Sequence, residues 1–407
     1  MPGALDGLRV LDIATLYSAP LVAAMLGDLG ADVIKIEPPT GDGLRDLGAK
    51  ADGHSLTWAA TARNKRSLTL DLREPTGQRL FHRLVEGADV VVENLPETTL
   101  ERWACRYEDL AAIKPDLIVV SVTCYGKTGP YADRAGNGSL AEAFGGLTHM
   151  TGEADGPPLL PSVPVGDVLA AIAGTVGALA ACYARDARGA GGQRVDVSMY
   201  EPILQFLSNG VMQYVKTGEV AHRSGSRIPG AVPRNTYRAR DGQWLALSAV
   251  TDRMVERLLV AMGRDPAAEA HRYATTALRA IHGDELDADV AAWIAPLDRA
   301  EALDRLVAAK LPAGPVNDVA DIVEDPHVRA RESVQEVHDP ALGALTMVGP
   351  LARLERTPAT IRSSGPALGA HTDAILRDEL GLSDEEIAEL RQAGIIGDRA
   401  APAAEQE

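Results

Sequence analysis

The sequence predicts an α/β protein with a large domain built on a Rossmann-like parallel sheet and a smaller α+β domain. Two observations lead to this prediction. In the first half of the chain, short apolar runs typical of buried strands alternate with helical patterns, which favours a parallel sheet covered on both faces. From about Gly225 the pattern changes to turns and a hairpin around Asp241 and Gly242, followed by charged helical stretches. We therefore assign residues 1–224 to the large domain and residues 225–330 to the small domain.

The first half divides into strands and helices in a regular order. Strands are expected at residues 8–14, 31–37, 67–72, 88–94 and 117–123, and helices at residues 20–27, 78–86, 98–103 and 107–113. Parallel sheets bind ligands at the carboxyl ends of their strands. The segments that follow three of these strands, residues 15–20, 93–97 and 124–130, are therefore expected around one crevice.

Composition limits the possible partners. The chain has 407 residues, 24% of them charged, and a formal net charge of −17 without basic blocks. Nucleic acid needs clusters of Lys and Arg, so a nucleic-acid partner is not expected. The first predicted turn reads ATLYSAP and lacks the glycines of a dinucleotide motif, which argues against a nicotinamide or flavin cofactor. The nine histidines are scattered, so no metal site is predicted.

The cysteines and the ends of the chain indicate a cytoplasmic protein. Cys105, Cys124 and Cys182 lie in apolar stretches without metal-like spacing, as buried reduced thiols do. The first residues lack the basic and apolar regions of a signal peptide, and the tail APAAEQE is expected to be disordered. Residues 168–184 are apolar but short for a bilayer span, and Gly174 and Gly177 interrupt them, so we expect a core helix and no membrane partner.

Asp167 opens this apolar, glycine- and alanine-rich run. A structural interpretation is that it caps the helix, since Asp is a favoured N-cap and the helix dipole favours its ionised form. A functional interpretation is that an ionised carboxylate at a helix start acts as a nucleophile toward an activated acyl group. The local pattern leaves both open.

Cations follow several predicted strands. Arg45, Arg73, Arg102, Lys127 and Arg134 all come shortly after a strand. Positive groups at one sheet edge suit an anionic ligand with an adenosine phosphate, although each residue taken singly is also consistent with a solvated surface position.

Taken together, the segments resemble family III CoA-transferases, the group of formyl-CoA transferase and carnitine CoA-transferase that also contains alpha-methylacyl-CoA racemase. The resemblance extends over nearly the whole chain and includes the segments NKRSLTLDLREPTGQ, ADVVVENLPETTLER, PVGDVLAAIAGTVGALAA, GGQRVDVSMYEP and PAGPVNDVADIVEDPHV. It implies an interlocked, ring-like homodimer. It also implies that the large domain is built from both ends of the chain, with residues 331–407 returning to it.

The resemblance also implies the site residues. Asp167 matches the aspartate that carries covalent catalysis in the transferases, through an aspartyl anhydride and an aspartyl-CoA thioester. The matching CoA contacts are Leu16, Tyr17, Ser18, Leu70, Asp71, Leu72, Arg73, Asn94, Leu95, Pro96, Arg102, Arg134, Ala135, Gly136, Asn137 and Gly138. Acyl-CoA and a small carboxylic acid are then the substrates, and no separate cofactor is needed.

Two features bear on the type of reaction. Racemases of this family use a histidine where this chain has Asn137, and an amide does not shuttle protons at neutral pH. The glycine-rich flap of formyl-CoA transferase has no comparable run here; residues 224–230 are the nearest match. The sequence therefore favours CoA transfer. An acyl-CoA racemase and a non-catalytic CoA-binding protein remain the alternatives.

Overall fold

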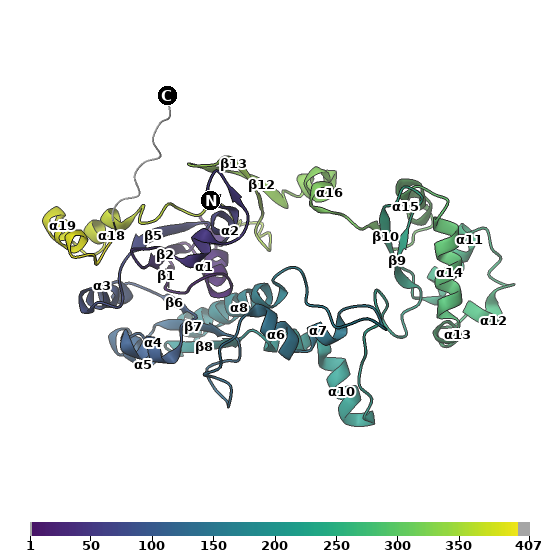
Figure 1. The fold of residues 1–407 in the computed structure, drawn as a ribbon, viewed down its shortest axis with the longest axis horizontal. Helices are drawn as coiled ribbons and strands as arrows, with labels where there is room; N and C mark the ends of the chain where they lie inside the picture. Colours follow the sequence, from purple (N-terminus) through teal and green to yellow (C-terminus); the bar gives the residue numbers. More distant parts are fainter. Residues whose placement is uncertain (1, 398–407) are drawn as a thin grey trace. The chain divides into compact units, whose positions relative to one another are not determined.

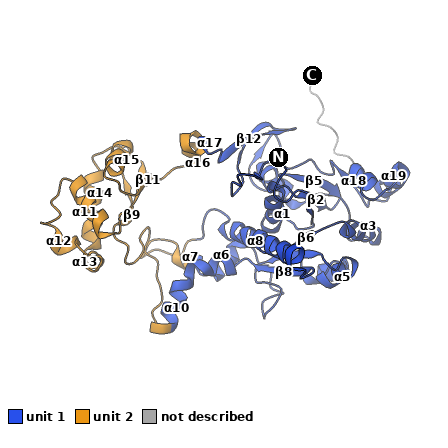
Figure 2. Ribbon diagram, turned by 180° about the vertical axis from the view of Figure 1, so that it is seen from behind, with its two compact units in different colours: residues 1–147, 160–215, 329–407 blue, residues 148–159, 216–328 orange. Residues whose placement is uncertain are grey.

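The computed structural model describes residues 2–397 and divides into two compact units. Unit 1 is built from residues 1–147, 160–215 and 329–407, and unit 2 from residues 148–159 and 216–328 (Figure 2). Residues 148–159 and 216–224, which were expected in the large domain, are grouped with unit 2, and residues 329–330, which were expected in the small domain, are grouped with unit 1. The tail that was expected to be disordered lies outside the described residues from position 398 onward.

Unit 1 contains a six-stranded sheet in which all neighbouring strands are parallel (Figure 1). In spatial order the strands are β5 (Lys65–Thr69), β2 (Asp32–Glu37), β1 (Arg9–Asp12), β6 (Val90–Glu93), β7 (Ile118–Thr123) and β8 (Gln193–Ser198). The predicted α/β fold with a Rossmann-like parallel sheet is confirmed. The strand order reverses between β1 and β6, and such a switch point opens a crevice at the carboxyl ends of the strands.

Alternating residues of the strands form two separate cores. Val10, Val90 and Val120 belong to the core that also contains buried residues of α1 (Ser18–Asp28) and α8 (Val165–Arg188). Their neighbours, including Leu11, Val91 and Val119, belong to the core on the other face, with α3 (Pro75–Glu86), α5 (Tyr107–Ile113), α18 (Thr372–Asp378) and α19 (Asp384–Gln392). A strand buried on both faces has a continuous apolar sequence, which explains why these strands could be predicted from the sequence.

The glycines of α8 allow it to pack closely on its neighbours. A Cβ atom added to Gly174 would lie 2.8 Å from Val22 Cγ2 of α1, and one added to Gly177 would lie 2.6 Å from Val195 Cγ1 of β8. Among the described residues, α8 is the one helix long and apolar enough to cross a membrane. It contacts α1, β7 and β8, so here it is a helix of the protein core.

Shorter elements complete unit 1. They are the 3-10 helices Gly43–Asp46 and Gln205–Leu207, the hairpins of β3 (Lys50–Ala51) with β4 (His54–Ser55) and of β12 (Val334–Asp339) with β13 (Gly343–Val348), and the helices α2 (Leu56–Thr61), α4 (Glu97–Arg102), α6 (Gly138–Phe144), α7 (Leu147–Met150), α9 (Glu201–Leu204) and α10 (Ser208–Thr217). The boundary with unit 2 falls within two of these helices: α7 belongs to unit 2 from Thr148 onward, and α10 from Lys216 onward.

Unit 2 has its own core around a small antiparallel sheet. Its strands, in spatial order, are β11 (Ala313–Pro315), β10 (Trp244–Ser248) and β9 (Arg234–Arg238). The hairpin expected around Asp241 and Gly242 joins β9 to β10. The helices are α11 (Asp252–Ala261), α12 (Ala270–Tyr273), α13 (Thr276–Ile281), α14 (Gly283–Ile294), α15 (Arg299–Ala308), α16 (Val319–Glu324) and α17 (Pro326–Ala330).

Candidate active site

Two residues join the β1 and β6 ends of the sheet across the switch point. The main-chain amide of Thr15 donates a 2.9 Å hydrogen bond to Asn94 Oδ1, and Asn94 Nδ2 donates a 2.8 Å bond to the Thr15 carbonyl. Because both hydrogen-bonding groups of the Asn94 amide are used, this side chain fixes the loop between β1 and α1. Asn94, one of the predicted CoA contacts, therefore connects two of the segments that were expected around the crevice.

A cavity of about 230 Å³ opens at the carboxyl ends of β1, β2, β5 and β6. Five of the predicted CoA contacts line it: Leu70, Asp71, Leu72, Arg73 and Leu95. The other lining residues are Ile13, Ala14, Thr15, Lys35, Ile36, Glu37, Pro38, Thr40, Asp42 and Trp103. The cavity thus joins segments that are far apart in the sequence.

Asp71 and Arg73 form a local pair at the cavity. The guanidinium of Arg73 donates to both Asp71 carboxylate oxygens, at 2.8 Å from Nε and 2.6 Å from Nη2. These bonds hold the pKa of Asp71 below its usual value. Two-thirds of the Arg73 side chain remains exposed, so the guanidinium is accessible to an anion from solution. The Asp71 amide donates to the carbonyl of Ile395, and the C-terminal segment thereby positions this pair.

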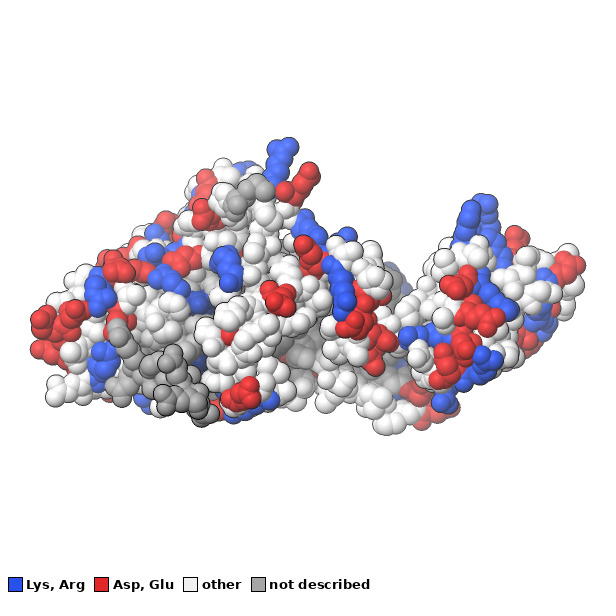
Figure 3. Space-filling view, turned by 90° about the horizontal axis from the view of Figure 1, so that it is seen from above, with Lys and Arg blue, Asp and Glu red and all other residues white. Residues whose placement is uncertain are grey.

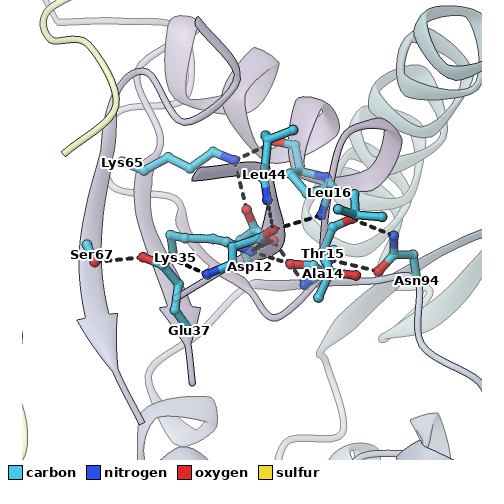
Figure 4. A network of polar contacts seen from close by, with 12 residues as sticks. Asp12, Ala14, Thr15, Leu16, Lys35, Glu37, Leu44, Lys65, Ser67 and Asn94 are labelled. Carbon is cyan, nitrogen blue, oxygen red and sulfur yellow. Dashed lines mark hydrogen bonds and ion pairs between the residues drawn. The ribbon is translucent and has the colours of Figure 1, made fainter. Parts of the chain in front are cut away.

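Two buried lysines, Lys35 and Lys65, contact the loop between β1 and α1 and the strand before it (Figure 4). Lys35 Nζ lies 3.1 Å from Asp42 and 3.6 Å from Asp12 and donates to the carbonyl of Ala14. Lys65 Nζ donates to Asp12 at 2.8 Å and to the carbonyl of Pro20 at 2.6 Å. Burial alone disfavours the charged form of Lys35, but the nearby carboxylates outweigh it and raise its pKa. Charged side chains of the strands therefore fix both ends of the loop.

Leu16 has an unusual backbone conformation within this loop. Its φ of 65° lies in the left-handed region, which costs an ordinary residue about 1 kcal/mol or more. Its amide donates a 3.2 Å hydrogen bond to Asp42 Oδ1, and its side chain is 45% exposed. Strain of this kind is found where surrounding structure over-determines a functional loop.

Asp167 lies in the first turn of α8, where helices α1 and α6 also begin. The hydroxyl of Ser18 donates a 3.0 Å hydrogen bond to its main-chain carbonyl. A Cβ atom added to Gly138, the first residue of α6, would lie only 1.9 Å from Asp167 Oδ2. The Asp167 side chain is half-buried and does not line the cavity described above. The loop from Thr15 to Ser18 links the two, since Thr15 lines the cavity and Ser18 bonds Asp167.

The structure corrects the structural interpretation of Asp167. Pro164 occupies the N-cap position and Asp167 is the third residue of the helix, so Asp167 is not the cap. Its pKa is raised to about 6 by burial and by the charge of Glu142, instead of being lowered by the helix dipole. Burial and the Glu142 charge therefore outweigh the backbone hydrogen bond that lowers the pKa of Asp167. With a pKa of about 6, roughly nine-tenths of the carboxyl is still ionised at pH 7.

Glu142 was not predicted as a site residue. Its side chain is only 1% exposed, and its Oε1 accepts a 2.8 Å hydrogen bond from the amide of Gly166. The one sequence signal for it is its place among small apolar residues in the segment LAEAF, because a helix of this composition packs against the core.

The segment from Arg134 to Gly138 runs past Asp167 into α6. The Arg134 guanidinium lies 3.6 Å from the centre of the Tyr131 ring, and Ala135 is exposed. Gly136 packs so closely that an added Cβ would lie 2.4 Å from Cys124 Sγ. Asn137 caps α6 by accepting a 3.1 Å hydrogen bond from the amide of Leu140. The residue at the racemase histidine position thus has a structural role.

A ring cluster next to this segment was also missed. Tyr125, Tyr131, Phe144 and Tyr200 meet edge to face with ring centres 4.9–6.0 Å apart, and Phe144 is 49% exposed. These residues are scattered along the chain, and no spacing rule connects them.

Two predicted CoA contacts and two predicted cations lie outside the lining of this cavity. Pro96 is the N-cap of α4 and Arg102 its last residue; both are exposed and neither lines the cavity. Arg45 bonds Glu37 through two nitrogens at 2.8 Å, and Lys127 lies 3.1 Å from Glu93. These two cations are therefore neutralised within the protein.

On the face drawn in Figure 3, basic and acidic side chains are interspersed. No group of three metal-ligating side chains occurs within residues 2–397.

Comparisons with known proteins identify the family of this chain. The model of CoA-transferase family III matches residues 5–372. Succinyl-CoA–D-citramalate CoA-transferase of Chloroflexus aurantiacus is 40% identical over 97% of this chain and 98% of its own length. Succinyl-CoA:mesaconate CoA-transferase of Haloarcula marismortui is 36% identical over 93% of this chain and 97% of its own. A CaiB/BaiF family protein from Brucella suis superposes with a TM-score of 0.83 and 32% identity, covering 93% of this chain and all of the other. The chain therefore belongs to CoA-transferase family III and is a CoA-transferase.

Proposed function

We propose that this enzyme moves CoA from succinyl-CoA to a small dicarboxylic acid through covalent intermediates on Asp167. The observation that carries the proposal is the state of this carboxyl group. It is half-buried where three helices begin, and its pKa of about 6 makes it more basic than an ordinary aspartate while leaving it mostly ionised at neutral pH.

The reaction needs no external energy, because each step exchanges one activated acyl bond for another. An Asp167 oxygen attacks the thioester carbon, forming a mixed anhydride and releasing CoA thiolate. The thiolate attacks the Asp167 carbonyl carbon, which gives an aspartyl-CoA thioester and frees the first acid with one oxygen from Asp167. The acceptor carboxylate then attacks the carbonyl carbon of the aspartyl thioester, which forms a second anhydride and releases CoA thiolate again. CoA thiolate attacks the acceptor carbonyl and restores the Asp167 carboxylate.

The cavity residues are proposed to bind the nucleotide end of CoA. Arg73 presents an exposed guanidinium suited to phosphate, and Leu70, Leu72 and Leu95 provide apolar walls. The loop of Leu16, Tyr17 and Ser18 then leads from the cavity to Asp167, as the pantetheine arm must. The further contacts in this proposal are Asp71, Asn94, Pro96, Arg102, Arg134, Ala135, Gly136, Asn137 and Gly138.

The substrates are inferred from the relatives. The names of these enzymes pair succinyl-CoA with D-citramalate, L-malate or mesaconate. These acids are dicarboxylic acids of four or five carbons, which sets the class tested first.

A homodimer is also proposed. On α10, Val211, Met212, Tyr214 and Val215 are each more than half exposed. An apolar helix face of this kind is usually covered by a partner. Sedimentation velocity at several protein concentrations tests this, and a monomer throughout would contradict it.

The activity test is a transfer assay with succinyl-CoA and a panel of dicarboxylic acids. Wild type is expected to form the new CoA thioester, and Asp167→Ala to lose at least 10³-fold in rate, an order of magnitude set by losing the nucleophile. Transfer at an unchanged rate by the variant would defeat the proposal. Exchange of the α-proton of acyl-CoA in deuterated water without transfer would favour a racemase instead.

A further inference from the structure

Glu142 is a buried carboxylate that the transfer steps do not use. It extends from α6 to the first turn of α8, where it accepts the hydrogen bond from Gly166, the residue before Asp167. The hydrogen-bond donor to its Oε1 is a neutral main-chain amide, whereas buried carboxylates are usually paired with a cation. A neutral glutamine would accept the same bond at lower cost. The negative charge therefore needs an explanation beyond packing.

The position of Glu142 brings its charge close to Asp167. A Cβ atom added to Gly166 would lie 3.3 Å from Glu142 Cγ and 2.8 Å from the Gly138 carbonyl. Gly138 in turn touches the Asp167 carboxylate. Glu142, Gly138 and the Asp167 turn therefore form one close-packed group with little room for water to screen the two carboxylates.

Titratable groups from three elements face Asp167. They are Tyr17 before α1, Cys124 after β7, and Glu142 in α6. Burial raises the pKa of the Tyr17 hydroxyl and of the Cys124 thiol, so both are neutral at pH 7. Of these three groups, Glu142 is thus the one whose negative charge acts on the Asp167 carboxylate.

We propose that Glu142 is a positioning residue of the transfer reaction, whose buried charge repels the Asp167 carboxylate until its negative charge leaves. This inference rests on the proposed function of Asp167. When an Asp167 oxygen forms the new C–O bond, the C–S bond breaks and the charge departs with the CoA thiolate. The repulsion between the two carboxylates is then relieved, so the anhydride is favoured relative to the resting state. The hydrogen bond to Gly166 meanwhile keeps the Asp167 turn in place.

Glu142→Gln separates charge from shape, because the amide oxygen still accepts from Gly166. We expect the midpoint pH of adduct formation on Asp167, measured in single turnovers with succinyl-CoA, to fall by about one unit in this variant. The rate at pH 8 should fall about tenfold. Glu86→Gln, at the exposed end of α3, is the matched control and should match wild type. A Glu142→Gln profile that superposes on wild type overturns the proposal.

A second measurement does not depend on transfer. The carboxyl ¹³C resonance of Asp167, assigned by its absence in Asp167→Asn, is titrated in wild type and in Glu142→Gln. A lower midpoint in the variant supports the coupling, and an unchanged midpoint overturns it. If wild type forms no adduct on Asp167, the proposed function fails while this titration still decides whether Glu142 acts on Asp167.

Discussion

The hydroxyl of Ser18 donates its hydrogen bond to the main-chain carbonyl of Asp167 across 149 positions of the chain. The bond joins the first turn of α1 to the first turn of α8 on one face of the sheet. Because Thr15, three residues earlier, lines the cavity, this bond fixes the spacing between the proposed CoA site and the proposed nucleophile.

Ser18→Ala is therefore expected to affect both stability and rate. Loss of one buried hydrogen bond should lower the free energy of unfolding by about 1 kcal/mol. Slight misplacement of Asp167 should slow adduct formation about tenfold. Urea unfolding and single-turnover kinetics measure the two effects. Ser363→Ala, at an exposed serine, is the control, and equal behaviour of both variants would show that the bond has no positioning role.

Gly138→Ala is expected to block the nucleophile. The new methyl group would lie 1.9 Å from Asp167 Oδ2, so the carboxylate must turn away from its position. We expect at least a hundredfold loss of transfer rate. In Gly314→Ala the added methyl meets nothing within 4 Å, and this control should keep full activity. A Gly138→Ala enzyme as fast as the control would mean that the Asp167 conformation seen here is not the reactive one.

Arg73→Ala tests the proposed phosphate contact. An exposed guanidinium that binds phosphate should mainly affect KM for succinyl-CoA, which we expect to rise about tenfold with kcat little changed. The effect should shrink in high salt, because exposed charges are screened. Arg79→Ala on α3, outside the cavity lining, is the comparison. Equal KM values for the two variants would remove Arg73 from the CoA site.

The raised pKa of Asp167 predicts a pH-dependent stability difference. Its folded pKa of about 6 lies above the ordinary aspartate value of 3.8, so ionising Asp167 costs more free energy in the folded state than in the unfolded state. The stabilising contribution is complete below about pH 4 and is lost as the pH rises through 6. Asp167→Asn should therefore be more stable than wild type at pH 8, by roughly 1–2 kcal/mol, and similar to it at pH 4. Urea unfolding at both pH values decides this, and a constant difference would argue against the raised pKa.

The elements predicted best from the sequence are those whose burial follows from local composition. The strands of unit 1 are apolar on both faces, so runs such as residues 117–123 stand out against the helices between them. The existence of the core helix that contains Asp167 was predicted for the same reason, from its apolar composition. Its start was misplaced: α8 begins at Val165 with Pro164 as cap, three residues before the start that an Asp167 cap implies.

Side-chain partners could not be predicted, because they come from distant segments. Arg45 and Lys127 look like ligand-binding cations in the sequence, but Glu37 and Glu93 neutralise them in the fold. Glu142 looks like an ordinary helical glutamate and becomes buried only where α6 meets α8. The pKa of Asp167 depends on these tertiary contacts, so its direction could not be obtained from the helix dipole alone.

The central claim is that Asp167 forms a covalent bond to the transferred group. Wild type is incubated with succinyl-CoA, quenched, treated with hydroxylamine and digested, and the peptide spanning Asp167 is analysed by mass spectrometry. We predict a hydroxamate on Asp167 that is absent without succinyl-CoA. An unmodified Asp167 peptide from enzyme that is turning over would contradict the covalent account.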